Sequence, residues 1–330
     1  MDSVSQFVLG AAVSAAALGP RTKAWRSVLW GGVIATLPDL DVLIDHGDPV
    51  TNMVVHRSES HALFWLTLVT PLLAFGIASL HRERALFGRW CLAVWLALVT
   101  HPLLDWMTIY GTRLLLPFDS EPLGIGSLFV IDPLYTLPLL IGSAAMVVAR
   151  GSPRGRRWNA AGLVLSTLYA IWSLVAQQQA LAAARRSLAT NGVVASQLLA
   201  TAAPLQTMLW RLVAIDGDRV LEAHWSVFDG ERTIEWTAVE RGNALREAMR
   251  GVPAVETLAA FSHGFWKMAK DGDRVLMTDV RMGMEPRYYF TFAIGRAPGD
   301  VQRVGSRLDV ARGIAWLWPR MWGEPVPPPR

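Results

Sequence analysis

Histidine and aspartate side chains are concentrated in three short segments that adjoin apolar stretches of the chain. The candidate metal ligands are Asp39, Asp41, His56, His61, His101 and Asp105. An ionisable side chain at membrane depth costs about 3 kcal/mol on insertion scales, so it is kept there where it pairs, binds an ion or takes part in chemistry. Imidazole and carboxylate groups together suit zinc, manganese or iron. We therefore predict a divalent metal ion at the edge of a membrane, zinc first, with manganese or iron as alternatives.

The spacing within each segment determines which ligands can converge. His101 and Asp105 are four residues apart, so on a helix they share one face and can hold one ion together. Asp39 and Asp41 are two residues apart, which places them on different sides of a regular helix. These two carboxylates converge only if the chain is extended there or if the helix is ending.

Each segment also has a purely structural interpretation. His56 and His61 suit one histidine in a loop and one in the first turn of the next helix, for which Ser58 is the expected N-cap. A single Asp-x-Asp at a helix end is more often a cap, and a single interfacial histidine is more often a hydrogen-bonded amphipathic residue. The metal interpretation is favoured because all six candidates fall on one predicted face of the membrane, at the ends of three helices.

The composition is typical of a membrane protein. Of 330 residues, 52% are hydrophobic and 18% are charged, whereas about a quarter of residues are charged in soluble domains. The single cysteine, Cys91, excludes an internal disulfide framework and a multi-cysteine metal cluster. The basic clusters fall between apolar helices, so we expect no nucleic-acid partner. The expected partners are membrane lipids and an unidentified small-molecule or lipid substrate.

Apolar segments long enough to cross a bilayer recur in the first half of the chain. We interpret residues 7–18 as a short membrane helix and not as a cleaved signal, because no positive charge precedes them. The further candidates are roughly 27–45, 61–80, 86–106, 127–149 and 159–179. The expected fold is therefore a polytopic α-helical membrane domain of about five to six spans over residues 1–182.

Residues 183–330 are predicted to form a small α+β domain outside the membrane. An alanine-rich polar helix over 181–203 leads into it. Alternating apolar runs around two Asp-Gly-Asp turns predict strands, and the segments between the two hairpins have helical periodicity. The expected strands are 209–215, 219–225, 264–269, 274–280 and 288–294, and the expected helices are 243–250 and 255–261.

Basic residues in short loops predict the orientation in the membrane. The loops at 21–26, 82–89 and 150–157 each contain three or four basic residues, whereas the alternate loops, 46–60 and 107–126, contain one arginine each and several acids. Positive charge marks the cytoplasmic side of short loops. Both termini, the predicted metal ligands and the C-terminal domain are therefore expected on the outer, periplasmic face.

The ordered combination of these motifs resembles the YdjM-like family of inner-membrane metal-dependent hydrolases. The matching runs are Leu37 to Asp41, His56 to His61, His101 to Thr112, Pro117-Phe118 and Thr278 to Gly283. The resemblance implies a multi-pass protein of the bacterial inner membrane that uses a bound divalent ion for hydrolysis. The chain departs from the family pattern at Ala62, where a hydroxyl residue is common.

In metal-assisted hydrolysis the ion lowers the pKa of its water to about 7 and polarises a phosphoryl or carbonyl oxygen. Glu59 is a candidate general base or a solvated acid at a helix start. Arg57 and Arg113 are candidates for holding a phosphate, or else they pair with the carboxylates of the site. In the last matching run, Arg281 either faces the substrate or pairs with Asp279.

A site at head-group depth favours phosphoester or lipid-linked substrates. Two alternatives without hydrolytic activity remain open. One is an ion carrier, in which the same side chains line a pathway; the apolar inner halves of the spans are less typical of it. The other is a metal-binding sensor or scaffold.

Overall fold

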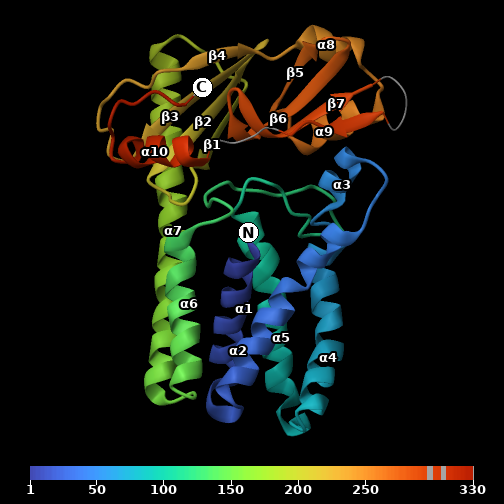
Figure 1. Ribbon diagram of the computed structural model, residues 1–330, viewed down its shortest axis with the longest axis vertical. Helices are drawn as coiled ribbons and strands as arrows, with labels where there is room; N and C mark the ends of the chain where they lie inside the picture. The colour runs from blue at the N-terminus through green and yellow to red at the C-terminus, as the bar shows by residue number, and fades with distance from the viewer. Residues whose placement is uncertain (296–299, 306–309, 330) are drawn as a thin grey trace. The chain divides into compact units, whose positions relative to one another are not determined.

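The computed structural model describes residues 1–295, 300–305 and 310–329. The chain divides into two compact units: Met1–Leu43 with Arg57–Ser173, and Ile44–His56 with Leu174–Arg330. The long helix α7 (Pro153–Thr190) contributes to both of them (Figure 1).

Apolar helices build the first unit (Figure 1). Besides the first part of α7 they are α1 (Ser3–Leu18), α2 (Ala24–Thr36), α4 (Leu63–Leu80), α5 (Phe87–Trp106) and α6 (Pro133–Val148). Short 3-10 turns link them: η1 (Gly19–Arg21), η2 (Pro38–Leu43), η3 (Glu59–His61) and η4 (Arg84–Leu86). Within the described residues, four segments are long and apolar enough to cross a membrane, namely Ser3–Arg21, Leu63–Leu80, Arg84–Trp106 and Pro153–Thr190; the apolar helix Pro133–Val148 is shorter.

The helix expected over 27–45 is much shorter than predicted. Helix α2 has 13 residues, which is about 20 Å of helix against a hydrocarbon core of about 30 Å. It stops before Pro38, because proline has no N–H to donate and its ring clashes with the preceding turn. The chain then continues as the 3-10 turn η2, which carries Asp39 and Asp41.

Close packing of α1 against α2 depends on two glycines. A Cβ atom on Gly31 would lie 2.3 Å from the Gly10 carbonyl oxygen, and one on Gly10 would lie 2.3 Å from Cβ of Ala35. Small residues allow two helix backbones to approach closely, as they do at many membrane helix interfaces. Leu98 of α5 and Leu66 of α4 pack in the same buried core as Ala35. The packing thus brings the end of α2 next to α5.

Two antiparallel four-stranded sheets form most of the second unit (Figure 1). One has the strand order β1 (Gln197–Ala202), β2 (Leu209–Asp216), β3 (Arg219–Ser226), β4 (Thr237–Glu240); the other has β5 (Trp266–Asp271), β6 (Arg274–Met284), β7 (Arg287–Ile294), β8 (Val301–Arg303). The helices of this unit besides α7 are α3 (Pro49–Val55), α8 (Asn243–Ala248), α9 (Pro253–Phe261) and α10 (Val310–Met321). Both predicted hairpins, the strand at 288–294 and the two predicted helices are present.

The helix predicted over 181–203 is wrong in its second half. Helix α7 ends at Thr190, and residues 197–202 form strand β1, which pairs in antiparallel register with β2. Alanine and leucine favour a helix locally, but pairing with β2 buries Ala200 and Ala202 in the sheet. Tertiary pairing therefore outweighs the local preference.

Candidate metal centre

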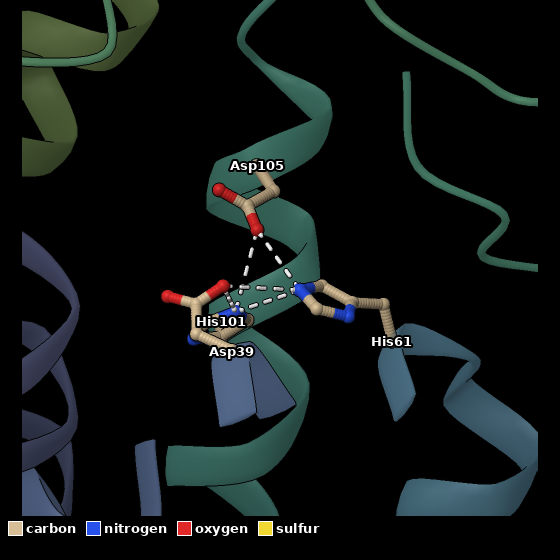
Figure 2. Close-up of side chains that lie close together, drawn as sticks. All are labelled: Asp39, His61, His101 and Asp105. Carbon is tan, nitrogen blue, oxygen red and sulfur yellow. Dashed lines mark hydrogen bonds and ion pairs between the residues drawn. The ribbon is translucent and has the colours of Figure 1, made fainter. Parts of the chain in front are cut away.

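Four side chains of the first unit converge on one point (Figure 2). They are Asp39, His61, His101 and Asp105, and one ligand atom of each lies within 4.8 Å of the ligand atoms of the other three. Both imidazoles and the Asp105 carboxylate have no exposed surface. Buried carboxylates and imidazoles at this density require compensation by a proton, a cation or hydrogen bonds.

Three separate elements supply these side chains. Asp39 lies on η2, directly after the break at Pro38, and His61 is the last residue of η3, just before α4 begins. His101 and Asp105 lie one turn apart on α5, with His101 Nε2 3.3 Å from Asp105 Oδ2. The four-residue spacing therefore places both on one helix face, as helical geometry requires.

Hydrogen bonds fix which nitrogen of each imidazole carries the proton. His101 Nδ1 lies 2.6 Å from the carbonyl oxygen of Ala35, which can only accept, so Nδ1 is the donor. His61 Nδ1 lies 2.8 Å from the Ser60 hydroxyl, which donates its own proton to Asp41 Oδ2 at 2.6 Å and so accepts from His61. In the neutral rings both Nε2 atoms are therefore left with lone pairs, which is the form that binds metals.

The two Nε2 atoms face each other at 3.1 Å. Two lone pairs at that distance repel unless a proton or a cation lies between them. Asp105 Oδ2 lies 3.4 Å from His61 Nε2, and within the described part of the chain this buried oxygen accepts no hydrogen bond. A positive charge at this point would compensate all three atoms.

The separations of the ligand atoms fit a tetrahedral ion. Asp39 Oδ1 lies 3.4 Å from both His61 Nε2 and His101 Nε2, so these five separations in the group run from 3.1 to 3.4 Å. Zinc bonds of about 2.0–2.1 Å to nitrogen and oxygen place tetrahedral ligands about 3.3–3.4 Å apart. The four side chains could therefore hold one divalent ion.

Asp41 and His56, also predicted as ligands, lie outside this group of four. Asp41 Oδ2 accepts hydrogen bonds from the Arg57 backbone N–H at 3.0 Å and from Ser60. It also lies 3.5 Å from His61 Nδ1, the ring nitrogen that does not face the other candidate ligands. His56 follows the last residue of α3 and belongs to the second compact unit.

Of the predicted catalytic residues, Arg57 lies nearest to the ligands. It is 6% exposed, and its Nη2 lies 3.2 Å from Asp105 Oδ1. Arg113 donates from its backbone to the Arg57 carbonyl oxygen at 3.0 Å and from Nη1 to Ser58 Oγ at 3.1 Å. Glu59 is exposed at the start of η3 and is outside the group of four.

Asp105 is held in place partly by Met1 and Gln6, which sequence reasoning missed. Its Oδ1 accepts a hydrogen bond from Gln6 Nε2 at 3.2 Å and contacts the Met1 amino group. Thr108 is buried, donates to the Asp105 carbonyl oxygen and accepts from Arg57. Gln6 could have been singled out as an amide beside an apolar run, whereas helical spacing does place Thr108 on the face of His101 and Asp105 if the helix continues.

In the second unit the structure pairs Arg281 with Asp279. Both are buried, and Arg281 Nη2 lies 2.6 Å from Asp279 Oδ2. On the neighbouring sheet, burial raises the pKa of Glu222, but the Arg211 guanidinium beside it holds that pKa below its usual range. These buried charges are compensated within the unit.

Comparison with known proteins adds one finding. A family described as YdjM inner membrane protein matches residues 1–180, more than half of the chain and all of the candidate metal ligands. No curated protein and no solved structure matches the chain. The chain belongs to the YdjM family of inner membrane proteins.

Proposed function

We propose that this protein is a metal-dependent hydrolase of the bacterial inner membrane that acts at the membrane surface. The observation that carries the proposal is the group Asp39, His61, His101 and Asp105, whose ligand-atom separations suit one divalent ion. Such an ion, when bound, makes water a stronger acid and polarises a phosphoryl or carbonyl oxygen. Zinc fits the ligand set best, with manganese and iron as alternatives.

The residues around the group prepare it for this role. The Ala35 carbonyl and the Ser60 hydroxyl hold both imidazoles in the metal-binding tautomer. Arg57 and Gln6 hold Asp105 Oδ1, which turns Oδ2 toward the two histidines. The ligands are thus oriented before an ion arrives.

Two arginines favour a phosphoester over a neutral ester as substrate. The Nε atoms of Arg57 and Arg113 are buried and donate no hydrogen bond to the described residues. An unpaired buried donor is costly, and a phosphate oxygen would accept from it strongly. We assign both arginines to phosphate binding. Glu59, which is exposed, is the candidate proton acceptor that solvent can reach.

One observation favours a second function, a metal-stabilised sensor or scaffold. Four protein ligands complete a tetrahedron, and structural zinc sites are closed in this way, whereas catalytic zinc sites keep one position open. Under this alternative the ion would stabilise the junction of η2, η3 and α5 and no substrate would be turned over.

Hydrolysis of a soluble phosphodiester by the detergent-purified protein distinguishes the proposed hydrolase from the sensor or scaffold. We expect bis(p-nitrophenyl) phosphate to be hydrolysed by protein loaded with zinc or manganese and not after chelation. His101→Ala should abolish the rate. The matched control is His81→Gln, because His81 lies at the end of α4 opposite His61. Glutamine at this position keeps a hydrogen-bond acceptor for the Trp30 indole. A metal-loaded protein that hydrolyses neither phosphodiesters nor phospholipids would support the sensor or scaffold.

We also propose that the site and the C-terminal domain face the periplasm. The proposal is supported by the basic residues concentrated in the loops 21–26, 82–89 and 150–157.

A further inference from the structure

An apolar groove of about 500 Å³ runs beside the start of α4 in the first unit. Its walls include Leu63, Phe64 and Leu68 of α4 and Leu115 and Phe118 of the loop after α5. We propose that this groove binds an acyl chain of a membrane phospholipid whose phosphate lies at the metal centre. The assignment of a phospholipid as substrate rests on the proposed hydrolase function; binding in the groove does not.

Several of the apolar side chains that line the groove are exposed. Helix α4 is one of the candidate spans, and only 28% of it is buried. Leu68 is 64% exposed and Phe118 is 79% exposed. Exposed apolar side chains on a membrane-spanning helix contact the hydrocarbon core, which consists of acyl chains. The hydrocarbon available to fill this concave surface is therefore an acyl chain.

Phe64 and Phe118 form the rim of the groove. Their rings meet edge to face with centroids 5.5 Å apart. Aromatic side chains are enriched where hydrocarbon meets the head groups. A chain that lies along these two rings would thus carry its polar end at the level of the loop 112–118.

The backbone that forms the groove also carries the metal centre. Leu63 is two residues from the ligand His61, and its N–H donates to the Leu114 carbonyl oxygen at 3.0 Å. On the same two segments, the Arg113 N–H donates to the Arg57 carbonyl oxygen at 3.0 Å. Groove residues therefore lie close in sequence to site residues, Leu63 two positions after His61 and Leu114 directly after Arg113, and hydrogen bonds hold the two segments together.

Two arginines lie on the segments that form this end of the groove, and one of them, Arg57, also pairs with Asp105. Arg57 and Arg113 carry the buried Nε donors that find no acceptor among the described residues. Leu114 and Leu115, which directly follow Arg113, already line the groove. An acyl chain along α4 with its phosphate beside these guanidinium groups would cover the apolar walls and accept hydrogen bonds from the Nε donors. A second copy of the protein or another apolar helix would cover the walls but would not supply a phosphate.

Photolabelling tests binding in the groove without requiring turnover. The full-length protein is reconstituted in phosphatidylethanolamine vesicles that contain a trace of phosphatidylglycerol with a diazirine at the end of one acyl chain. We expect adducts on residues 63–71 and 114–118 at least threefold above those on residues 164–168 of α7, which are also largely exposed. Leu68→Trp should remove this enrichment, whereas Leu168→Trp, at a 56% exposed position on α7, should not.

Leu115→Trp serves as a second groove-filling variant in case Leu68→Trp does not fold, and metal content checks the fold of each. A diacylglycerol carrying the same diazirine tests whether the phosphate contributes to binding. It should label the groove at least threefold less than the phospholipid. Equal labelling of the groove and α7, equal labelling by both probes, or crosslinks between copies in place of lipid adducts would overturn the proposal.

The photolabelling and hydrolysis results separate the two proposals. Groove labelling in a protein that hydrolyses nothing would refute the hydrolase and leave the phospholipid site standing. Hydrolysis of a soluble phosphodiester without groove labelling would refute the lipid site and leave the hydrolase standing.

Discussion

The glycine contact between α1 and α2 is expected to control metal binding from a distance. In Gly31→Ala the new Cβ would lie 2.3 Å from the Gly10 carbonyl oxygen. Because both atoms belong to packed helices and neither is the end of a flexible side chain, the helices must separate. An ordinary contact of 3.4 Å requires a shift of about 1 Å.

That shift would reach the candidate metal centre through α2. Ala35 lies one turn beyond Gly31, and its carbonyl oxygen lies 2.6 Å from His101 Nδ1. Moving α2 by about 1 Å would stretch this contact to about 3.6 Å, beyond a hydrogen bond. Loss of such a support for a ligating histidine typically costs about 10- to 100-fold in metal affinity. Overpacking alone should lower stability by about 1–3 kcal/mol.

The assay is chelator competition for zinc on the detergent-purified protein, with a thermal melt of the same samples. The matched control is Gly76→Ala on α4, where an added Cβ meets nothing within 4 Å. There the change should leave zinc affinity unchanged and raise helix stability by about 0.5–1 kcal/mol. Unchanged zinc affinity in Gly31→Ala would refute the reasoning that α2 positions His101.

Three further outcomes are expected. Ser60→Ala should weaken zinc binding by about 10-fold or more, measured by the same competition, because it removes the acceptor of one ligating imidazole. In a Cys91→Ser background, a cysteine at Asp119 should react with an impermeant thiol reagent in intact cells and one at Arg84 should not; the reverse would place the site in the cytoplasm. In the second unit, burial together with nearby arginines lowers the pKa of His224 from 6.5 to about 3. Between these values the unfolded chain binds a proton that the folded unit does not, so stability should fall as the pH drops below 6.5, by at most about 1.4 kcal/mol per unit. In pH-dependent melts His224→Gln should flatten this slope, and an unchanged slope would contradict the assignment.

The sequence is most informative about the site where spacing within one helix decides the geometry. The four-residue interval between His101 and Asp105 needs only the period of an α-helix to place both on one face. The proline after Leu37 likewise permits the helix to end where Asp39 must turn toward α5. Local rules are sufficient for these two features.

The choice between Asp39 and Asp41 required three-dimensional structure. Both lie on η2, and in a 3-10 turn residues two apart point in different directions. Asp39 faces the two imidazoles, whereas Asp41 bonds Ser60 and the Arg57 backbone. Which carboxylate faces inward depends on where η3 packs, and no periodicity in the sequence encodes that.

The roles of Gln6 and Ala35 depend on helix packing between distant segments. Gln6 lies 99 residues from Asp105 in sequence, and Ala35 contributes only a backbone oxygen. The strand at 197–202 also depends on contact with another segment, because pairing with β2 and not its own composition determines it. Contacts of this kind become visible only when the fold is known.

The metal content of the purified protein tests the central claim most directly. After zinc loading and removal of excess ion, elemental analysis should find about one divalent ion per chain, as a single four-ligand group predicts. His101→Ala and His61→Ala should each lose most of this ion while still inserting in the membrane, whereas His81→Gln should retain it. A wild-type protein that binds no divalent ion, or a His101→Ala protein with full occupancy, would contradict the metal centre.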